Sequence, residues 1–253
     1  LHFHKKRNDV KILSCNPGYP NKDIFKDYYN KKKKYNNFNG IEIFRVPVFS
    51  RRKEDFSIII NYITFIFSSF VFGFFKLLKL KTNCIFIFGT SPILSALPAI
   101  FLGKIFKKKI FLWVLDLWPD NLIELGKVKN KILIFILKKT VKYIYDNCDV
   151  VFVQSKSFKT EIAKISKCKC IYFPSWAEDI GKNRVLAKEI KKYKHHLKIL
   201  FTGNIGEAQS FESVVKCANL LKKKYIAKWI IVGSGRWKNN LKKLINENDL
   251  NED

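Results

Sequence analysis

The sequence predicts an α/β protein with two parallel-sheet domains. Short apolar runs alternate with longer helix-patterned segments, which is typical of parallel strands joined by crossover helices on both faces of a sheet. The alternation occurs twice, and a lysine-rich stretch over residues 181–196 separates the two series. We therefore expect an N-terminal domain over residues 1–180, a linker over 181–196, and a second domain beginning at residue 197 and continuing to 253.

The individual elements follow from hydrophobic periodicity and from turn residues. Apolar runs rich in Val, Ile and Phe indicate buried strands, and longer stretches with apolar residues three or four apart indicate helices. In the first series the expected strands are 10–14, 42–47, 84–88, 110–115, 150–153 and 170–173, and the expected helices are 58–80, 94–106, 131–147 and 157–165. In the second series the expected strands are 198–201 and 228–232, and the expected helices are 211–223 and 237–246.

The composition indicates a folded chain with an excess of positive charge. Hydrophobic residues make up 47% of the 253 residues, which is enough to bury a core and excludes wholesale disorder. A formal net charge of +27 suggests an anionic partner, such as an anionic membrane surface, but AT-rich codon usage with solvated lysine faces is the favoured explanation. We expect no specific nucleic-acid binding, because zinc-finger spacing, an RNP-like aromatic run and an arginine-rich helix are all lacking in the sequence.

The six cysteines predict neither a metal site nor a disulfide framework. They are scattered, and only Cys168 and Cys170 are close, on alternate positions of an expected strand that place them at one shared buried or edge site. This usage favours a reducing compartment, and we expect no metal. The sequence contains no methionine and opens without a signal peptide, so we expect a fragment of a longer cytoplasmic protein.

One expected helix is unusually apolar. Residues 56–75 carry no charge and are long enough to cross a hydrocarbon core. Polar residues within the segment, and basic residues at both ends, favour a helix that packs on the protein and exposes an aromatic edge. A true span would also place the strands at 10–14 and 84–88 on opposite sides of a membrane, so that they could not share one sheet.

An acidic loop follows the strand at 110–115. In open parallel sheets ligands bind beside the carboxyl ends of the strands, so Asp116 and Asp120 are candidate catalytic carboxylates. Acids after a strand also cap helices or accept loop hydrogen bonds, which is the structural alternative. Trp118 in the same loop, and Trp176 later in the chain, are placed either to stack on a sugar or to pack.

Two glycine turns follow strands of the second series. A strand, a glycine turn and a helix amino terminus present N–H groups and a positive dipole end to an anion, although such a turn is often only a turn. The candidate residues for binding a nucleotide diphosphate are Gly203, Asn204, Gly206 and Gln209 in the first turn and Gly233 and Gly235 in the second.

Seven segments share their order with one known family. The Asp116–Pro119 loop resembles the DLWP segment of bacterial family 4 glycosyltransferases, particularly the surface-polysaccharide subgroup that includes fucosamine-type transferases. The match runs from residue 10 to about residue 244, and the shared order makes it specific. The other six segments are residues 16–20 (PNYP-like), 45–48 (RVP), 61–65 (NYLSF-like), 90–92 (SPP-like), 174–178 (PNWAD-like) and 203–209 (GNIGxAQ).

This resemblance implies a GT-B fold, with two facing Rossmann-type domains of which the second is only partly present. It implies that a sugar is transferred from a UDP-linked donor to a lipid-linked glycan acceptor, with retention of configuration and without a metal. The resemblance places this reaction in surface-polysaccharide or O-antigen synthesis. Such an enzyme needs no cofactor and acts as a peripheral protein on the cytoplasmic face of the plasma membrane. The acceptor side would include Tyr19, Ser91, Trp118 and Trp176.

The chain departs from the family pattern at several places. Many members carry an arginine and a lysine in the first glycine turn, where Asn204 and Gln209 stand here, and a histidine where Leu115 stands. The resemblance also implies that the first strand and the family's paired glutamates lie outside residues 1–253, so we expect this piece alone to be inactive. A non-enzymatic basic protein that binds membrane or nucleic acid, and a sugar-nucleotide epimerase of the same fold, are the alternative functions.

Overall fold

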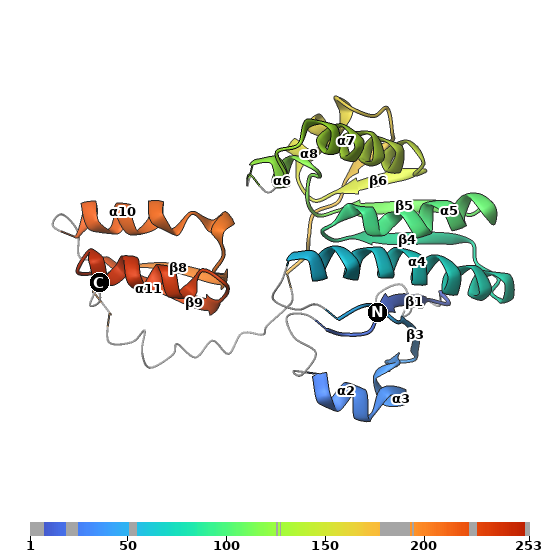
Figure 1. Ribbon diagram of the computed structural model, residues 1–253, viewed down its shortest axis with the longest axis horizontal. Coiled ribbons are helices and arrows are strands. Elements are labelled where there is room, and N and C mark those ends of the chain that lie inside the picture. The colour runs from blue at the N-terminus through green and yellow to red at the C-terminus, as the bar shows by residue number, and fades with distance from the viewer. Residues whose placement is uncertain are drawn as a thin grey trace. The chain divides into compact units, whose positions relative to one another are not determined.

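The computed structural model describes residues 8–18, 25–50, 55–124, 126, 128–177, 193, 195–222 and 227–250. The chain divides into two compact units, residues 1–176 and 177–253, so the boundary falls just before the expected linker. Tyr19 and most of the expected linker lie outside the described residues. Each unit is described by itself (Figure 1).

The first unit contains two separate sheets. The smaller has the strand order β1-β3-β2, in which β1 and β3 are parallel and β2 is an antiparallel addition. The larger has the order β4-β5-β6-β7 and is parallel throughout, as the sequence predicts. The strands are β1 (Lys11–Cys15), β2 (Asn37–Phe38), β3 (Ile41–Val46), β4 (Cys84–Gly89), β5 (Lys109–Val114), β6 (Val150–Val153) and β7 (Cys170–Tyr172).

The helices of this unit agree with the predicted positions, apart from three short ones that the periodicity did not indicate. The predicted helix at 94–106 begins as a 3-10 turn, η2 (Ile93–Ala96), and continues as α5. The short unpredicted helices are α2 (Lys26–Asn30), α3 (Lys32–Tyr35) and α6 (Asp120–Glu124), and the longer ones are α4 (Asp55–Lys79), α5 (Leu97–Ile105), α7 (Lys131–Asp146) and α8 (Lys156–Ala163).

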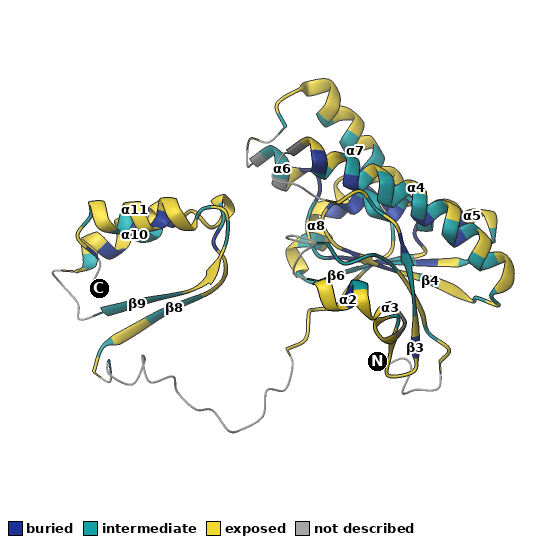
Figure 2. Cartoon of the chain, turned by 60° about the horizontal axis from the view of Figure 1, so that its bottom comes forward, coloured by how far each residue is buried: buried dark blue, intermediate teal, exposed yellow. Residues whose placement is uncertain are grey.

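Helix α4 joins the two sheets of the first unit. It packs against α5, β1 and β3. A Cβ atom added to Gly73 would meet Leu102 of α5 and Leu13 of β1, so this position admits no larger side chain without a shift. Figure 2 shows α4, α5 and α7 forming one helical layer above the strands. The strands at 10–14 and 84–88 therefore belong to two different sheets, which corrects the expectation that they share one.

The four-stranded sheet is covered on one face only within the described residues. Ile87, Leu112, Val114, Val151 and Val153 are buried in a core that also takes side chains from α5, α7 and α8. The opposite face carries aromatic side chains in contact with one another, and several of them are exposed. The prediction of helices on both faces is therefore wrong for the part of the sheet that is described, because α5, α7 and α8 all contribute to the core on the same face.

The second unit is a small parallel α/β half-domain. Strands β8 (Leu197–Asn204) and β9 (Ala227–Ser234) pair in parallel along their whole length. Helix α10 (Phe211–Leu221) connects them, a short 3-10 turn η3 (Glu207–Gln209) precedes α10, and α11 (Lys238–Glu247) follows β9. Its core is formed by Ile205, Phe211, Val215, Ala218, Leu241 and Leu250.

Candidate active site

Ser91 and Trp118 meet beside the carboxyl ends of β4 and β5. The Trp118 indole Nε1 donates a hydrogen bond of 2.5 Å to Ser91 Oγ. Trp118 is buried among the core residues, whereas Ser91 remains exposed. The packing alternative for Trp118 therefore describes its main contacts, since a buried ring is not available to stack on a ligand.

The two candidate carboxylates differ in their surroundings. Asp116 is exposed and makes no hydrogen bond or ion pair with any residue that the structure describes. Asp120 is the first residue of α6, and its Oδ1 lies 3.9 Å from Lys138 Nζ of α7. An acid in the first turn of a helix is stabilised by the helix dipole, so Asp120 has a structural explanation. The loop-bracing alternative has no support at Asp116 among these residues.

Gln154 connects the loops that follow three strands. It comes directly after β6, its Nε2 donates to the carbonyl oxygen of Leu115, and its Oε1 accepts a 2.9 Å hydrogen bond from Ser175 Oγ. This amide fixes the start of the acidic loop relative to the segment after β7. Sequence reasoning missed Gln154, although a polar residue immediately after a buried strand was a usable signal.

Trp176 lies flat on Trp113 at the end of the first unit. The ring centroids are 5.2 Å apart with an interplanar angle of 15°, and Trp113 Nε1 donates a 3.0 Å hydrogen bond to the Phe173 carbonyl oxygen. Trp113 is buried, but Trp176 is 69% exposed. One face of the Trp176 ring is thus occupied by Trp113, and the exposed remainder is available for contact with a ligand.

In the second unit, glycines allow two strand ends to approach closely. A Cβ atom at Gly233 would lie 1.9 Å from the Gly203 carbonyl oxygen, and one at Gly235 would lie 2.1 Å from the Ile205 carbonyl oxygen. Gly203 also has a φ of +151°, which a side chain would strain. The close backbone approach and the positive φ explain these three glycines. Their presence does not by itself indicate an anion site.

The remaining polar side chains of this edge hold the first turn together. Gly206 N–H donates a 3.0 Å hydrogen bond to Gln209 Oε1, so the Gln209 amide folds back on the turn. A Cβ atom at Gly206 would lie 2.8 Å from Asn204 Nδ2, which places that amide over the same turn. Arg236 follows β9 at the same edge, because Asn204 and Ser234 are paired in register. The backbone of Arg236 therefore lies close to the first turn.

Burial perturbs several titratable groups of the first unit. Burial raises the pKa of the Cys148 thiol to about 12, and burial together with the hydrogen bond that the Cys170 thiol donates to Cys168 raises the pKa of Cys170 to about 12. Cys168 Sγ and Cys170 Sγ are 3.5 Å apart, so the two thiols share one site as expected, although β7 begins only at Cys170. Burial also raises the pKa of Tyr145. Among the described residues no three His, Cys, Asp or Glu side chains are grouped to hold a metal ion.

The predicted residues thus form two groups, one in each unit. The group in the first unit lies at the carboxyl edge of the four-stranded sheet and consists of Ser91, Asp116, Trp118 and Asp120. Trp176 follows β7, a strand of the same sheet. The predicted donor residues lie at the carboxyl edge of β8 and β9: Gly203, Asn204, Gly206, Gln209, Gly233 and Gly235.

Three curated glycosyltransferases are similar in sequence to this chain. The putative colanic acid biosynthesis glycosyl transferase WcaI of Escherichia coli K12 is 23% identical over 257 residues, which cover 96% of this chain and 62% of that protein. The uncharacterized glycosyltransferase MJ1059 of Methanocaldococcus jannaschii is 31% identical over 196 residues, covering 70% of this chain and 46% of the relative. The chain thus spans about half to three-fifths of these relatives. No family model matches the chain.

Solved structures establish the fold. Sucrose-phosphate synthase from Thermosynechococcus elongatus superposes with a TM-score of 0.61 at 15% identity, covering 96% of this chain and 59% of that structure. Anabaena HepE in complex with UDP and glucose superposes with a TM-score of 0.55 at 12% identity, covering 96% of this chain and 67% of that structure. The fold is the GT-B type, with a Rossmann-like parallel sheet in each unit, as the sequence predicts.

Proposed function

We propose that this chain is part of a retaining glycosyltransferase that moves a sugar from a UDP-linked donor to a lipid-linked glycan acceptor. The similarity to WcaI and MJ1059 over most of the chain supports glycosyl transfer. The observation that carries the proposal is the exposed carboxylate of Asp116, which has no partner among the described residues, at the carboxyl edge of a parallel sheet in a fold that HepE uses to bind UDP.

The second unit is the proposed donor side. The turn over residues 203–209 and the amino terminus of α10 would face the donor diphosphate. The N–H groups of Ile205, Gly206 and Gln209 already donate within this unit, so the diphosphate contacts fall to the other N–H groups of the turn and to the first turn of α10. Because the Gln209 amide is hydrogen-bonded within the turn, we assign charge neutralisation to Arg236, which follows β9 at the same edge. Because Gly233 and Gly235 have no side chain, the backbone around the end of β9 can lie directly against the carbonyl groups of Gly203 and Ile205. No metal is required, since a guanidinium and helix-end N–H groups neutralise phosphate.

The first unit is the proposed acceptor side. Asp116 would take up the proton of the acceptor hydroxyl and stabilise positive charge on the sugar ring, and Asp120 is the second candidate. Ser91 and the exposed part of Trp176 would contact the acceptor, with Trp118 holding Ser91 in place. Tyr19, outside the described residues, completes the proposed group.

The biological setting follows from the subgroup resemblance. We propose a role in surface-polysaccharide or O-antigen synthesis, at the cytoplasmic face of the plasma membrane, within the group that includes fucosamine-type transferases. The colanic acid assignment of WcaI supports polysaccharide synthesis. We also propose that the first strand and the donor-holding glutamates are encoded outside these residues.

The test is a donor titration followed by a transfer assay. Calorimetric titration of UDP into the protein from the complete reading frame should show binding. GDP should displace the bound UDP only weakly, because its affinity should be lower. Incubation with labelled UDP-sugars and a membrane extract should place label in the lipid fraction. Conversion of the UDP-sugar without an acceptor would instead favour the epimerase. Nucleotide-independent binding to DNA or vesicles, abolished by salt, would favour the basic-protein alternative.

A further inference from the structure

Helix α4 has its polar and small residues inside and its large apolar residues outside. Its buried positions include Ser57, Asn61, Ser69 and Gly73. Its exposed positions recur every three or four residues, which places them on one stripe of the helix. They are Phe56, Ile59, Ile63, Phe67, Val71, Phe75 and Leu78. This arrangement is the reverse of a water-facing surface helix and resembles packing in lipid, where small residues face protein.

Helix α4 thus packs on the protein along one face and exposes an apolar, aromatic edge on the other, as the sequence predicts. The segment Phe56–Lys79 is long and apolar enough to span a membrane, and only 11% of its apolar window is buried. Its inner face is nevertheless occupied, since Asn61 Nδ2 donates to the Phe49 carbonyl and Lys76 Nζ lies 3.9 Å from the Phe44 ring centroid. A helix that holds β3 and the loop after it along one side cannot also be surrounded by lipid.

The apolar surface continues onto two neighbouring helices. Phe101 and Ile105 of α5 are exposed, and Phe101 contacts Tyr143 of α7 with ring centroids 6.2 Å apart. The first two turns of α7 add Ile132, Leu133, Phe135 and Ile136, all exposed. Figure 2 shows these helices in one layer, with exposed residues on the side away from the strands. We call this surface the helical apolar face.

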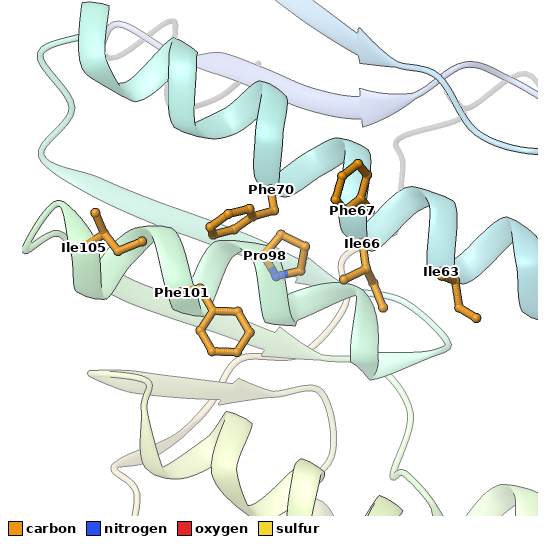
Figure 3. A pocket seen from close by; sticks show the side chains of 7 residues that line it. All are labelled: Ile63, Ile66, Phe67, Phe70, Pro98, Phe101 and Ile105. Atoms are coloured by element: carbon orange, nitrogen blue, oxygen red, sulfur yellow. The ribbon is translucent and has the colours of Figure 1, made fainter.

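A groove runs between α4 and α5 within the helical apolar face. It has a volume of about 560 Å³, and all the residues that line it are apolar. Figure 3 shows the lining side chains coming from both helices: Ile63, Ile66, Phe67 and Phe70 from α4, and Pro98, Phe101 and Ile105 from α5. An apolar groove with no polar group to fix orientation suits a hydrocarbon chain rather than a polar ligand.

The charges around the helical apolar face identify its partner. Helices α4, α5 and α7 contain seven lysines and two acids, and Lys104 and Lys139 lie over aromatic rings of the face itself. A second copy of this chain would bring two such basic surfaces together, in a protein of net charge +27. Anionic lipid headgroups complement the lysines, while acyl chains complement the apolar residues between them.

We propose that the helical apolar face lies in the headgroup region of an anionic lipid leaflet, with α4 parallel to the membrane plane and a lipid chain in the α4–α5 groove. This membrane attachment rests on the proposed function only for its biological setting. The binding itself needs no nucleotide and no acceptor.

The test is flotation of the 253-residue chain with vesicles of phosphatidylcholine mixed with phosphatidylglycerol, and with phosphatidylcholine alone. The chain should float with the anionic vesicles, and Phe67→Glu should weaken this binding by about 10-fold or more, because a buried aromatic side chain is replaced by a charge. Leu220→Glu in α10 is the matched control, since Leu220 is 68% exposed and Phe67 is 70% exposed on their helices. Circular dichroism confirms that each variant is folded, and Ile132→Glu in α7 replaces Phe67→Glu if the latter unfolds.

Each other outcome overturns the proposal. Equal flotation of Phe67→Glu, Ile132→Glu and the unmodified chain would exclude the helical apolar face as the contact. Resistance of the bound chain to alkaline carbonate would indicate a membrane-spanning helix. Absence of flotation, together with a dimer that Phe67→Glu dissociates in sedimentation, would identify a second copy as the partner. None of these outcomes alters the UDP titration, so the proposed function is tested separately.

Discussion

At the scale of single residues, the two loop acids are distinguished by their neighbours. Asp120 combines a helix amino terminus with a nearby lysine, whereas Asp116 has neither among the residues that the structure describes. Sequence reasoning treated them as a pair, because both follow the same strand. The difference depends on where α6 begins and on how α7 passes beside it.

We predict that Asp116→Asn lowers turnover by about 100-fold or more, since general acid–base groups contribute on that order. The substitution keeps the shape and removes the charge, so the melting temperature and UDP affinity should change little. The measurement is labelled sugar transfer by the protein from the complete reading frame, with Asp120→Asn as the matched variant. Near-normal turnover of Asp116→Asn would return this residue to a structural role and leave Asp120 as the catalytic candidate.

A second residue-scale prediction concerns Asp149, which joins the starts of β5 and β6. Its Oδ1 accepts from Lys109 Nζ at 2.6 Å and its Oδ2 accepts from Ile110 N–H at 2.8 Å. These hydrogen bonds, led by the one from Lys109, lower the pKa of Asp149 in the folded state. The stabilisation is thus complete above the unfolded pKa, near 3.9, and is lost as the pH falls through the lower folded pKa.

Asp149→Ala should therefore lower the free energy of unfolding by about 1 kcal/mol at pH 7, because the Ile110 N–H loses its partner. Urea titrations of both proteins at neutral pH and at successively lower pH provide the measurement. The difference in the free energy of unfolding between the two proteins should decrease only below the unfolded-state pKa of Asp149. If this difference stayed constant down to the lowest pH, the carboxylate charge of Asp149 would contribute nothing to stability.

At the scale of elements, the β8–α10 turn is built so that two backbone segments touch. Gly233 and Gly235 admit no side chain because carbonyl oxygens of residues 203 and 205 lie in the way. Gly206 is different, since a Cβ atom there would meet only the ends of the Asn204 and Gln209 side chains, at 2.8 and 3.0 Å. This position can be changed without separating the strands.

We predict that Gly206→Ala weakens UDP binding by about 10-fold, equivalent to about 1.4 kcal/mol, by displacing the amides that shape the turn. Its thermal unfolding should stay close to that of the parent. Gly18→Ala is the control, because a Cβ atom there would lie no closer than 4.0 Å to its nearest neighbour, Asn16 O. Unchanged UDP affinity in Gly206→Ala would place the diphosphate elsewhere.

At the scale of the whole molecule, charge repulsion opposes folding. The chain carries 48 Lys and Arg residues against 21 Asp and Glu residues. The ion pairs between described residues, such as Lys142–Asp146 and Lys164–Glu161, are mostly exposed and contribute little. Net self-repulsion of this kind destabilises the compact state and is screened by salt.

We predict that the melting temperature rises by about 2–4 °C between low and moderate sodium chloride, equivalent to about 1 kcal/mol for a chain of this size. Sodium chloride is preferred to sulfate, because excluded salts stabilise proteins irrespective of charge. Differential scanning calorimetry provides the measurement. A melting temperature that falls with salt would mean that attractive pairs outweigh the repulsion.

The sequence by itself determined the order and type of the long elements. The strand at 150–153 was predicted to the residue, and the others to within a few residues, because buried parallel strands and amphipathic helices carry distinct periodicities. The seven ordered segments also indicated the GT-B fold. The short elements α2, α3 and β2 were missed, since a few residues carry too little periodicity to be recognised.

The tertiary structure alone decided which side chains face one another. Periodicity assigns a residue to a face but does not identify what packs on that face, so it could not show that α4 buries Ser57 and Asn61 and exposes Phe67. Nor could it show that Gln154 bridges two loops, or that Trp118 is buried on Ser91 while Trp176 is exposed. These facts depend on contacts between residues far apart in the chain, which form only when the strands pair and the helices pack on them.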